Sequence, residues 1–117
     1  MKHENLIVDL TYKFALDVMN ATKTMRAQKE FDLASQFWRA GTSIGANVEE
    51  GQAAQSRADF RSKMSIAAKE ARETRYWLRL ARDGKILSGE DSSELLEKIE
   101  SICKILTSIV KSISENP

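Results

Sequence analysis

Helix-breaking residues are nearly absent from this sequence. Its one proline is Pro117, and its five glycines are scattered with no motif spacing. Long stretches are therefore free to be helical, and apolar residues recur along them at steps of three and four. Alternation with a period of two is not sustained anywhere for the length of a strand. The sequence predicts an all-α fold.

Four periodic segments follow one another, separated by turn signals and by no linker long enough to divide domains. Asp32 is a suitable N-cap for the second segment, and Ser56 and Asp59 resemble a capping box at the start of the third. The expected bounds are Glu4 to Arg26, Asp32 to Gly51, Ser56 to Arg82 (stopped by Asp83–Gly84), and Ser88–Asp91 to Asn116–Pro117. We expect one domain over residues 1–117, an antiparallel up-down-up-down four-helix bundle.

Two of these helices carry more apolar surface than one core needs. The first helix has a main apolar row and a second one, which we expect to be covered from another side: Val8, Tyr12, Ala15, Leu16 and Met19. The third helix has one arc of Phe60, Met64, Ala67, Ala71 and Leu78, and another of Ile66, Trp77 and Leu80. For the third helix, self-association explains why both arcs are apolar.

Trp38 and Tyr76 lie off the main apolar arcs of their helices. Aromatic side chains are enriched in the cores of interfaces, so both are candidates for a subunit contact. Stacking on nucleic-acid bases is the alternative.

Gly41 and Gly45 are four residues apart on the second helix. Each costs up to about 1 kcal/mol relative to alanine in a helix. The pair leaves a strip where another backbone can approach closely. A pair that is merely tolerated is the alternative.

The sequence contains few candidate catalytic residues. His3 is the only histidine, so a histidine-based triad or a histidine metal site is not expected. Cys103 lies in the apolar arc of the fourth helix and is expected to be a small buried hydrophobe. We predict no cofactor, no metal and no small-molecule substrate. An enzyme with a carboxylate-only metal site remains as a third hypothesis.

Polar residues line one edge of the second helix and face acidic residues beside the core arc of the third. Buried charges need partners, and Arg39 is the expected partner of Glu70 or Glu73. The sequence predicts a polar network between helices or subunits, with a polar groove for a ligand or partner as the alternative. Its members are Arg39, Ser43, Asn47, Glu50, Asp59, Glu70 and Glu73.

Six arginines fall on one arc of the third helix, about 80° wide at 100° per residue. They are Arg57, Arg61, Arg72, Arg75, Arg79 and Arg82. The arginine fork suits phosphate because it donates two parallel hydrogen bonds. The stripe is interpreted either as a track for a nucleic-acid backbone or as a solvated helix face balanced by nearby acids.

Charge and location give two further expectations. The net charge of +1, from 18 basic and 17 acidic residues, argues against a strong nonspecific nucleic-acid binder. Nothing resembles a signal peptide or a membrane span, and a single cysteine suits a reducing compartment. We expect a cytoplasmic protein with no membrane partner.

Two motifs in order resemble a known family. The first is the run from Arg39 to Gly51, RAGTSIGANVEEG, and the second joins Asp59–Phe60 to SIA at 65–67 and KEARETRYWL at 69–78. They are similar to the bacterial four-helix bundle family named after proteins encoded in intervening sequences of 23S ribosomal RNA genes. Many members have proline where Gly45 stands and Ile-Ala where Val48–Glu49 stand; Asn47 matches.

The resemblance implies a four-helix bundle that assembles into rings, commonly pentamers. The chain is also similar to the accessory proteins of diversity-generating retroelements, which are basic pentamers that bind nucleic acid and a reverse transcriptase. The name of the family records a gene location and not a function. The leading hypothesis is a non-enzymatic homo-oligomeric scaffold or adaptor, with a link to RNA; the alternative is a nucleic-acid-binding accessory protein that uses the arginine stripe. The second and third helices are expected to supply the subunit contact.

Overall fold

A computed structural model of the chain describes the backbone of residues 2–115 and the side chains of residues 6–114. The side chain of His3 and the predicted helix end at Asn116–Pro117 lie outside the described residues. Four helices are present: α1 (Lys2–Ala27), α2 (Phe31–Gln52), α3 (Arg57–Asp83) and α4 (Gly89–Glu115). No strand occurs between residues 2 and 115, and the all-α prediction is confirmed.

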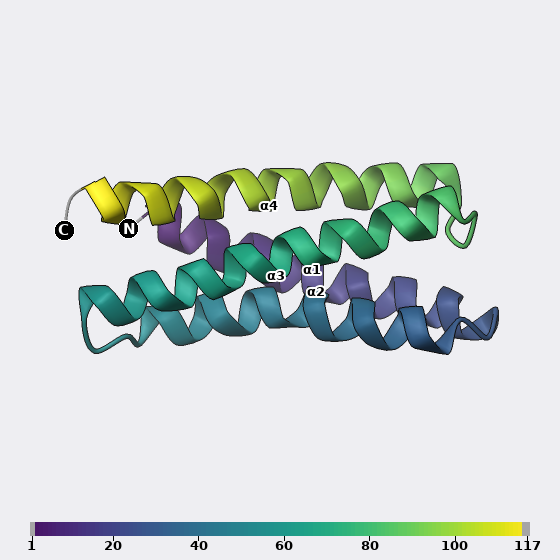
Figure 1. Ribbon diagram of the computed structural model, residues 1–117, viewed down its shortest axis with the longest axis horizontal. Helices are drawn as coiled ribbons and strands as arrows, with labels where there is room; N and C mark the ends of the chain where they lie inside the picture. The colour runs from purple at the N-terminus through teal and green to yellow at the C-terminus, as the bar shows by residue number, and fades with distance from the viewer. Residues whose placement is uncertain (1, 116–117) are drawn as a thin grey trace.

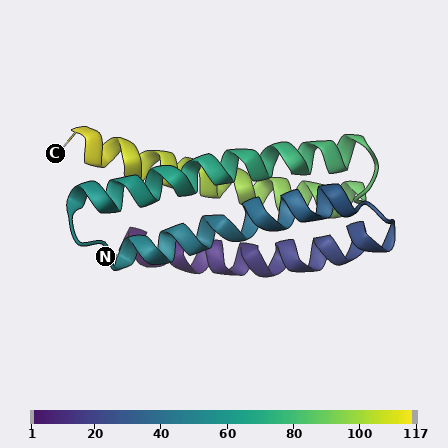
Figure 2. The same cartoon turned by 60° about the horizontal axis from the view of Figure 1, so that its bottom comes forward.

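The helices run alternately up and down, so that α1 begins and α4 ends at the same end of the bundle (Figure 1). The bundle measures 46 × 20 × 19 Å. α2 packs against α1 and α3, and α3 packs against α4, whereas α1 and α4 meet over a shorter stretch. In the turned view of Figure 2, α1 lies at the bottom with α2 above it, and α3 and α4 lie above α2 and cross in this view. Among the described residues α1 and α3 do not pack against each other, so they are diagonal in the bundle.

The core is built from the apolar rows that the sequence indicates. One row of each helix turns inward. Phe14 and Phe37 are the largest buried side chains of the core. Fully buried aliphatic residues from all four helices surround them: Ile7, Val18, Met25, Ile44, Val48, Met64, Leu78, Ile99, Ile102 and Leu106. Burying each such side chain contributes roughly 1.5–3 kcal/mol, so these rows position the outer faces of the helices.

Gly41 and Gly45 form the closest approach between α1 and α2. A Cβ atom on Gly45 would lie 3.3 Å from the backbone oxygen of Thr11, and one on Gly41 would lie 2.6 Å from Cγ2 of Val18. The structure therefore supports the packing role for this glycine pair over a merely tolerated one.

Serine side chains cap the last two helices: Ser56 does so as the sequence predicts, and Ser88 lies in the region where the fourth helix is expected to begin. Ser56 Oγ accepts a hydrogen bond of 3.0 Å from the Asp59 amide, and Ser88 Oγ accepts one of 3.0 Å from the Asp91 amide. These hydroxyls satisfy amides that have no partner within the first helical turn.

The start of α2 differs from the prediction. α2 begins at Phe31, one residue before the expected cap Asp32, and its N-cap Glu30 makes no side-chain capping bond. The reason is the turn before it: the Glu30 amide donates to the Met25 carbonyl at 2.9 Å, and Lys29 has φ of 65°. This Schellman-like ending of α1 leaves room only for a tight connection.

Four polar residues lie in the core: Thr11, Thr22, Thr74 and Ser92. Each hydroxyl donates to a carbonyl three or four residues earlier on its own helix, for example Thr11 to Ile7 at 2.7 Å and Thr74 to Glu70 at 2.8 Å. Among the described side chains, no buried nitrogen or oxygen lacks a hydrogen-bond partner. The core therefore holds no unsatisfied polar group for chemistry.

Candidate functional site

An arginine joins α2 to α3 on the outside of the bundle. Arg39 Nη1 donates to Glu70 Oε2 at 3.2 Å, and Arg39 Nη2 pairs with Glu73 Oε2. The Trp77 indole nitrogen donates to the same Glu73 oxygen at 3.0 Å. The pairing that the sequence predicts for Arg39 is present, and it holds both helices in register.

The other predicted members of the network do not join this cluster. Ser43 Oγ donates to the Arg39 carbonyl at 2.6 Å, and Asn47 Nδ2 donates to the Ser43 carbonyl at 2.9 Å. Glu50 pairs with Lys63 at 3.0 Å. A single network is therefore not formed within the chain. Short Ser and Asn side chains reach carbonyls on their own helix more easily than a neighbouring helix.

Asp59 also acts locally. Its Oδ2 accepts a bond of 3.3 Å from the Gln55 amide, just before α3 begins. A carboxylate is favourable at this place because the first amides of a helix point at it. Participation of Ser43, Asn47, Glu50 and Asp59 in a contact between subunits stays a prediction.

Loss of the Arg39 cluster is expected to weaken the bundle. An Arg39→Met substitution removes the cation from Glu70, which is 17% exposed, and from Glu73. We expect the free energy of unfolding to fall by about 1–2 kcal/mol, measured by urea denaturation followed by circular dichroism. Arg79→Met, at an exposed arginine, is the control and is expected to change it by less than about 0.5 kcal/mol. Equal losses in both variants would contradict a specific role for Arg39.

Two apolar stripes lie on the surface. The first, called the α1 stripe, consists of Tyr12, Leu16 and Met19, which are 60%, 47% and 39% exposed. These residues belong to the second apolar row of α1. Val8 of that row packs against the core, but these three side chains stay exposed, contrary to the expectation for a single bundle. They follow steps of four and three, and so form one line on the helix.

The second, called the α3 stripe, consists of Ile66, Tyr76 and Leu80, which are 39%, 50% and 43% exposed. Ile66, Glu73 and Leu80 are seven residues apart and lie on one line, which is the edge that meets Arg39 of α2. Tyr76 packs edge-on against Trp77, with 5.1 Å between ring centroids. Ile66 and Leu80 of the predicted second arc are exposed, whereas Trp77 of that arc is partly buried and packs against the core.

Trp38, the other aromatic candidate, is half-buried beside α1. The guanidinium carbon of Arg26 lies 5.4 Å from its ring centroid. This is cation–π distance, so one face of the indole is occupied within the chain.

The predicted arginine stripe lies along the seam of α3 and α4, but its members differ in surroundings. Arg61 Nε donates to Ser114 Oγ at 2.8 Å, and Arg75 Nη1 pairs with Glu100 at 3.0 Å. Arg82 pairs with its neighbour Asp83 at 2.8 Å. Arg57 also takes part in an interaction.

Arg72 and Arg79 remain exposed, and among the described residues neither forms an ion pair. Arg72 and Arg75 line a hollow of about 390 Å³ between α3 and α4, together with Lys104 and Lys111 of α4. We call this hollow the α3–α4 groove. Lys104 and Lys111 were not predicted as part of this site, because their position beside Arg72 depends on how α3 and α4 pack.

Cys103 lies beside this groove and is 7% exposed, as expected for a small buried residue. Burial raises the pKa of its thiol, and the nearby Arg75 only partly opposes this effect. A thiol held in its neutral form is a poor nucleophile.

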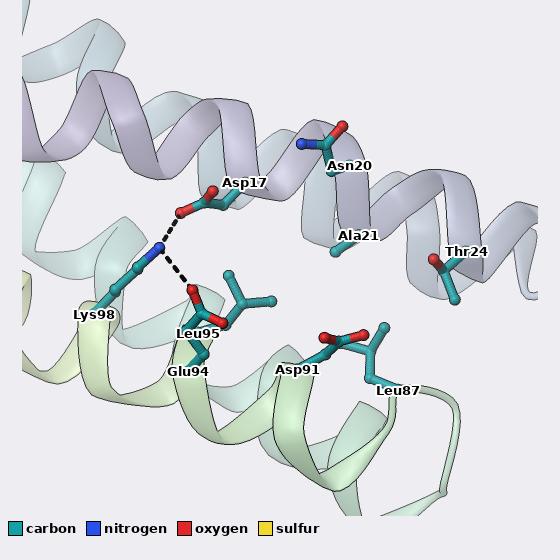
Figure 3. Close-up of a pocket in the computed structure, with 9 residues that line it drawn as sticks. All are labelled: Asp17, Asn20, Ala21, Thr24, Leu87, Asp91, Glu94, Leu95 and Lys98. Atoms are coloured by element: carbon teal, nitrogen blue, oxygen red, sulfur yellow. Dashed lines mark hydrogen bonds and ion pairs between the residues drawn. The ribbon is translucent and has the colours of Figure 1, made fainter.

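A further hollow, of about 210 Å³, opens between α1 and α4 and is drawn in Figure 3. Lys98 of α4 extends across it between two acids, 2.9 Å from Asp17 Oδ2 and 3.3 Å from Glu94 Oε1. The hydrogen bond to Asp17 raises the pKa of Lys98. Asp17 and Glu94 are therefore both held in ion pairs with this lysine.

Neither a metal site nor a membrane-spanning helix is found among the described residues. Among the residues that the structure describes, no three His, Cys, Asp or Glu side chains are placed to hold a metal ion. Within the same part of the chain, no helix has the length and apolar character needed to cross a membrane.

Comparison with protein families agrees with these helices and motifs. The model of the family described as 23S rRNA-intervening sequence protein matches residues 3–108. The chain belongs to this family. The match includes the Arg39 cluster, both apolar stripes and most of the α3–α4 groove, so the family resemblance read from the two motifs is confirmed.

A solved structure of this kind is also similar to the chain. It is a protein of unknown function from the S23 ribosomal protein family of Bacteroides thetaiotaomicron, 42% identical, with a TM-score of 0.89. The similarity covers 93% of this chain and 98% of that one. Comparison with curated proteins finds no relative that matches.

Proposed function

We propose that the protein is a non-enzymatic scaffold or adaptor of the cytoplasm that acts as a homo-oligomer, in the form of a closed ring. The observation that carries this proposal is the pair of exposed apolar stripes on α1 and α3. Six large exposed apolar side chains gathered on one face of α1 and one face of α3 differ from the scattered exposed residues of an ordinary monomer surface.

The position of the two stripes supports a ring. α1 and α3 are diagonal in the bundle, so the stripes face different directions and belong to different surfaces. A contact of the α1 stripe of one subunit with the α3 stripe of the next is heterologous. Heterologous contacts close into rings when the rotation between subunits divides a full turn. A pentamer is the ring size we propose, from the family resemblance.

We assign the proposed contact to α1 and α3, because both stripes lie on these helices. On α2, the only exposed large apolar side chain is Phe31, at 58%. The expectation that α2 and α3 supply the contact is therefore replaced by one in which α2 contributes mainly through Arg39, which borders the α3 stripe.

Three features support the non-enzymatic part of the proposal. Cys103 is buried with a raised pKa, the carboxylates Asp17 and Glu94 form ion pairs with Lys98, and the core hydroxyls are bonded to their own helices. None of these groups is placed as an activated nucleophile or base.

The solution mass tests the proposal directly. Light scattering on a sizing column should give a mass near five times the chain mass of 13.2 kDa, unchanged over a tenfold dilution. The mass should also be unchanged after treatment with ribonuclease, because the contact is made by protein. A mass of 13.2 kDa at all concentrations would overturn the proposal.

A second function, binding of a nucleic-acid backbone through the arginine stripe, is favoured by one observation. Arg72 and Arg79 are exposed and have no ion-pair partner among the described residues. Substituting Arg72, Arg75 and Arg79 together should weaken binding to all sequences alike. Unchanged affinity of this triple variant would remove the stripe from consideration.

A further inference from the structure

We propose that the α3–α4 groove is a binding site for the phosphodiester backbone of a single-stranded nucleic acid, read without regard to sequence. The inference rests on the second proposed function and assigns it a site. It adds Lys104 and Lys111 of α4 to the arginines of α3. It also distinguishes residues that would bind the ligand from residues that stabilise the bundle.

The charge of the groove supports an anionic ligand. Four cationic side chains line it: Arg72, Arg75, Lys104 and Lys111. Glu100 is the only carboxylate in its lining, and it pairs with Arg75. The lining therefore carries an excess of positive charge, although the whole chain has a net charge of only +1. Charge is segregated to this seam, where it focuses the electrostatic field.

Hydrogen-bond donors accompany the charges. Thr107 and Ser108 of α4 belong to the same lining and are exposed. Hydroxyl donors next to Arg and Lys side chains are the usual contacts to phosphate oxygens. Among the described residues, neither Arg72 nor Lys104 has an ion pair, so a phosphate does not have to displace a carboxylate from them.

The shape of the seam favours a polymer over a small anion. The groove, of about 390 Å³, is followed along the same two helices by a second hollow of about 480 Å³, which is lined by Arg57 and Arg61. From Arg61 to Arg75 the helix rises about 21 Å at 1.5 Å per residue. That length suits a chain of several nucleotides and exceeds what one phosphate occupies.

The absence of aromatic residues from both linings indicates how the strand would be read. Neither hollow has a Phe, Tyr or Trp in its lining. Stacking platforms for bases are therefore missing, and hydrogen bonds to phosphate carry no sequence information. At 100° per residue, Arg75 lies about 160° around α3 from Glu73, whereas Arg72 lies about 40° from Tyr76 of the α3 stripe, so the groove borders the proposed subunit contact along one side.

Fluorescence anisotropy with a labelled 20-nucleotide single-stranded RNA tests the site. If the four cations each neutralise one phosphate, log K should fall with log salt at a slope of about −2.8, or about 50-fold between 50 and 200 mM. The Arg72→Gln/Lys104→Gln variant should halve this slope to about −1.4 and weaken binding at least roughly tenfold at 50 mM salt. Lys13→Gln/Lys29→Gln removes the same charge from α1 and its turn, and is expected to weaken binding less than about twofold.

A gain of affinity provides a test that no unfolded variant can imitate. Glu100→Gln removes the only acid from the lining, so that a phosphate no longer has to displace a carboxylate from Arg75, and it should tighten RNA binding by roughly fivefold. An unchanged or weakened affinity in this variant would contradict the site.

The outcomes distinguish nucleic-acid binding by the protein from binding at the α3–α4 groove. If wild-type protein does not bind the RNA at 50 mM salt, both the groove and the second proposed function are overturned. If it binds but both double variants weaken it equally, nucleic-acid binding survives and the groove is overturned. Competition by inorganic phosphate at the same phosphate concentration as the RNA would mean a small-anion site, and a strong preference between U20 and A20 would mean base reading; either result overturns the proposal.

Discussion

A Leu16→Glu substitution is expected to convert the assembled protein into single chains without loss of helix content. In the separate chain Leu16 is 47% exposed, so a carboxylate there remains hydrated and costs little. Between two subunits the same carboxylate would be buried without a partner, at a cost of several kcal/mol per contact. The mass should fall to 13.2 kDa, and circular dichroism should stay unchanged.

A Leu80→Glu substitution on the α3 stripe is expected to have the same effect, and mixing the two variants provides the decisive result. In a heterologous contact each variant keeps one intact stripe, so the intact α3 stripe of one accepts the intact α1 stripe of the other. The mixture should therefore give a dimer of about twice the chain mass. If like stripes met like stripes, each variant alone would already dimerise, and this outcome would rule out the ring.

Leu6→Glu is the matched control for these variants. Leu6 lies on the same helix as Leu16 and is 46% exposed, but it is outside the α1 stripe. Its mass should equal that of the wild type. A monomeric Leu6→Glu variant would indicate that any added charge on α1 disrupts the assembly.

The second large effect is expected where α1 and α2 pack most closely. Gly41→Ala places a methyl group 2.6 Å from Cγ2 of Val18, and Val18 is β-branched and fully buried, so it has no free rotamer to adopt. Overpacking of this kind costs about 1–3 kcal/mol, more than the gain of up to about 1 kcal/mol from helix propensity. We expect a net loss of unfolding free energy in urea denaturation.

Two further variants separate the clash from other effects of the added methyl group. Val18→Ala in the Gly41→Ala protein should recover part of the loss, giving a coupling energy of at least about 1 kcal/mol in a double-mutant cycle. Gly89→Ala is the control, because no atom lies within 4 Å of the added carbon; it should not destabilise the protein. Additive effects of the Val18 and Gly41 substitutions would contradict the close packing.

The Arg39 cluster could be predicted from sequence because burial of an acid demands a partner. Glu70 and Glu73 stand beside an apolar arc, and Arg39 stands beside the apolar arc of the preceding helix. Adjacent antiparallel helices bring such edges together. Ser43 and Asn47 find carbonyl acceptors one turn earlier on their own helix. Within the chain they therefore do not join the Arg39 cluster, and their part in a contact between subunits stays a prediction.

The sequence by itself determined the number of helices, their order, the inward row of each, the serine cap of α3, and the burial of Cys103. These properties depend on local periodicity and on hydrogen bonds within one helical turn. Only the tertiary structure decided that Tyr12, Leu16 and Met19 are left exposed, that Gly41 meets Val18 and Gly45 meets the backbone of Thr11, and that Lys104 joins Arg72 in one groove. Each of these facts concerns two helices whose rotation and separation result from packing of the whole core, and no property of a single helix specifies that arrangement.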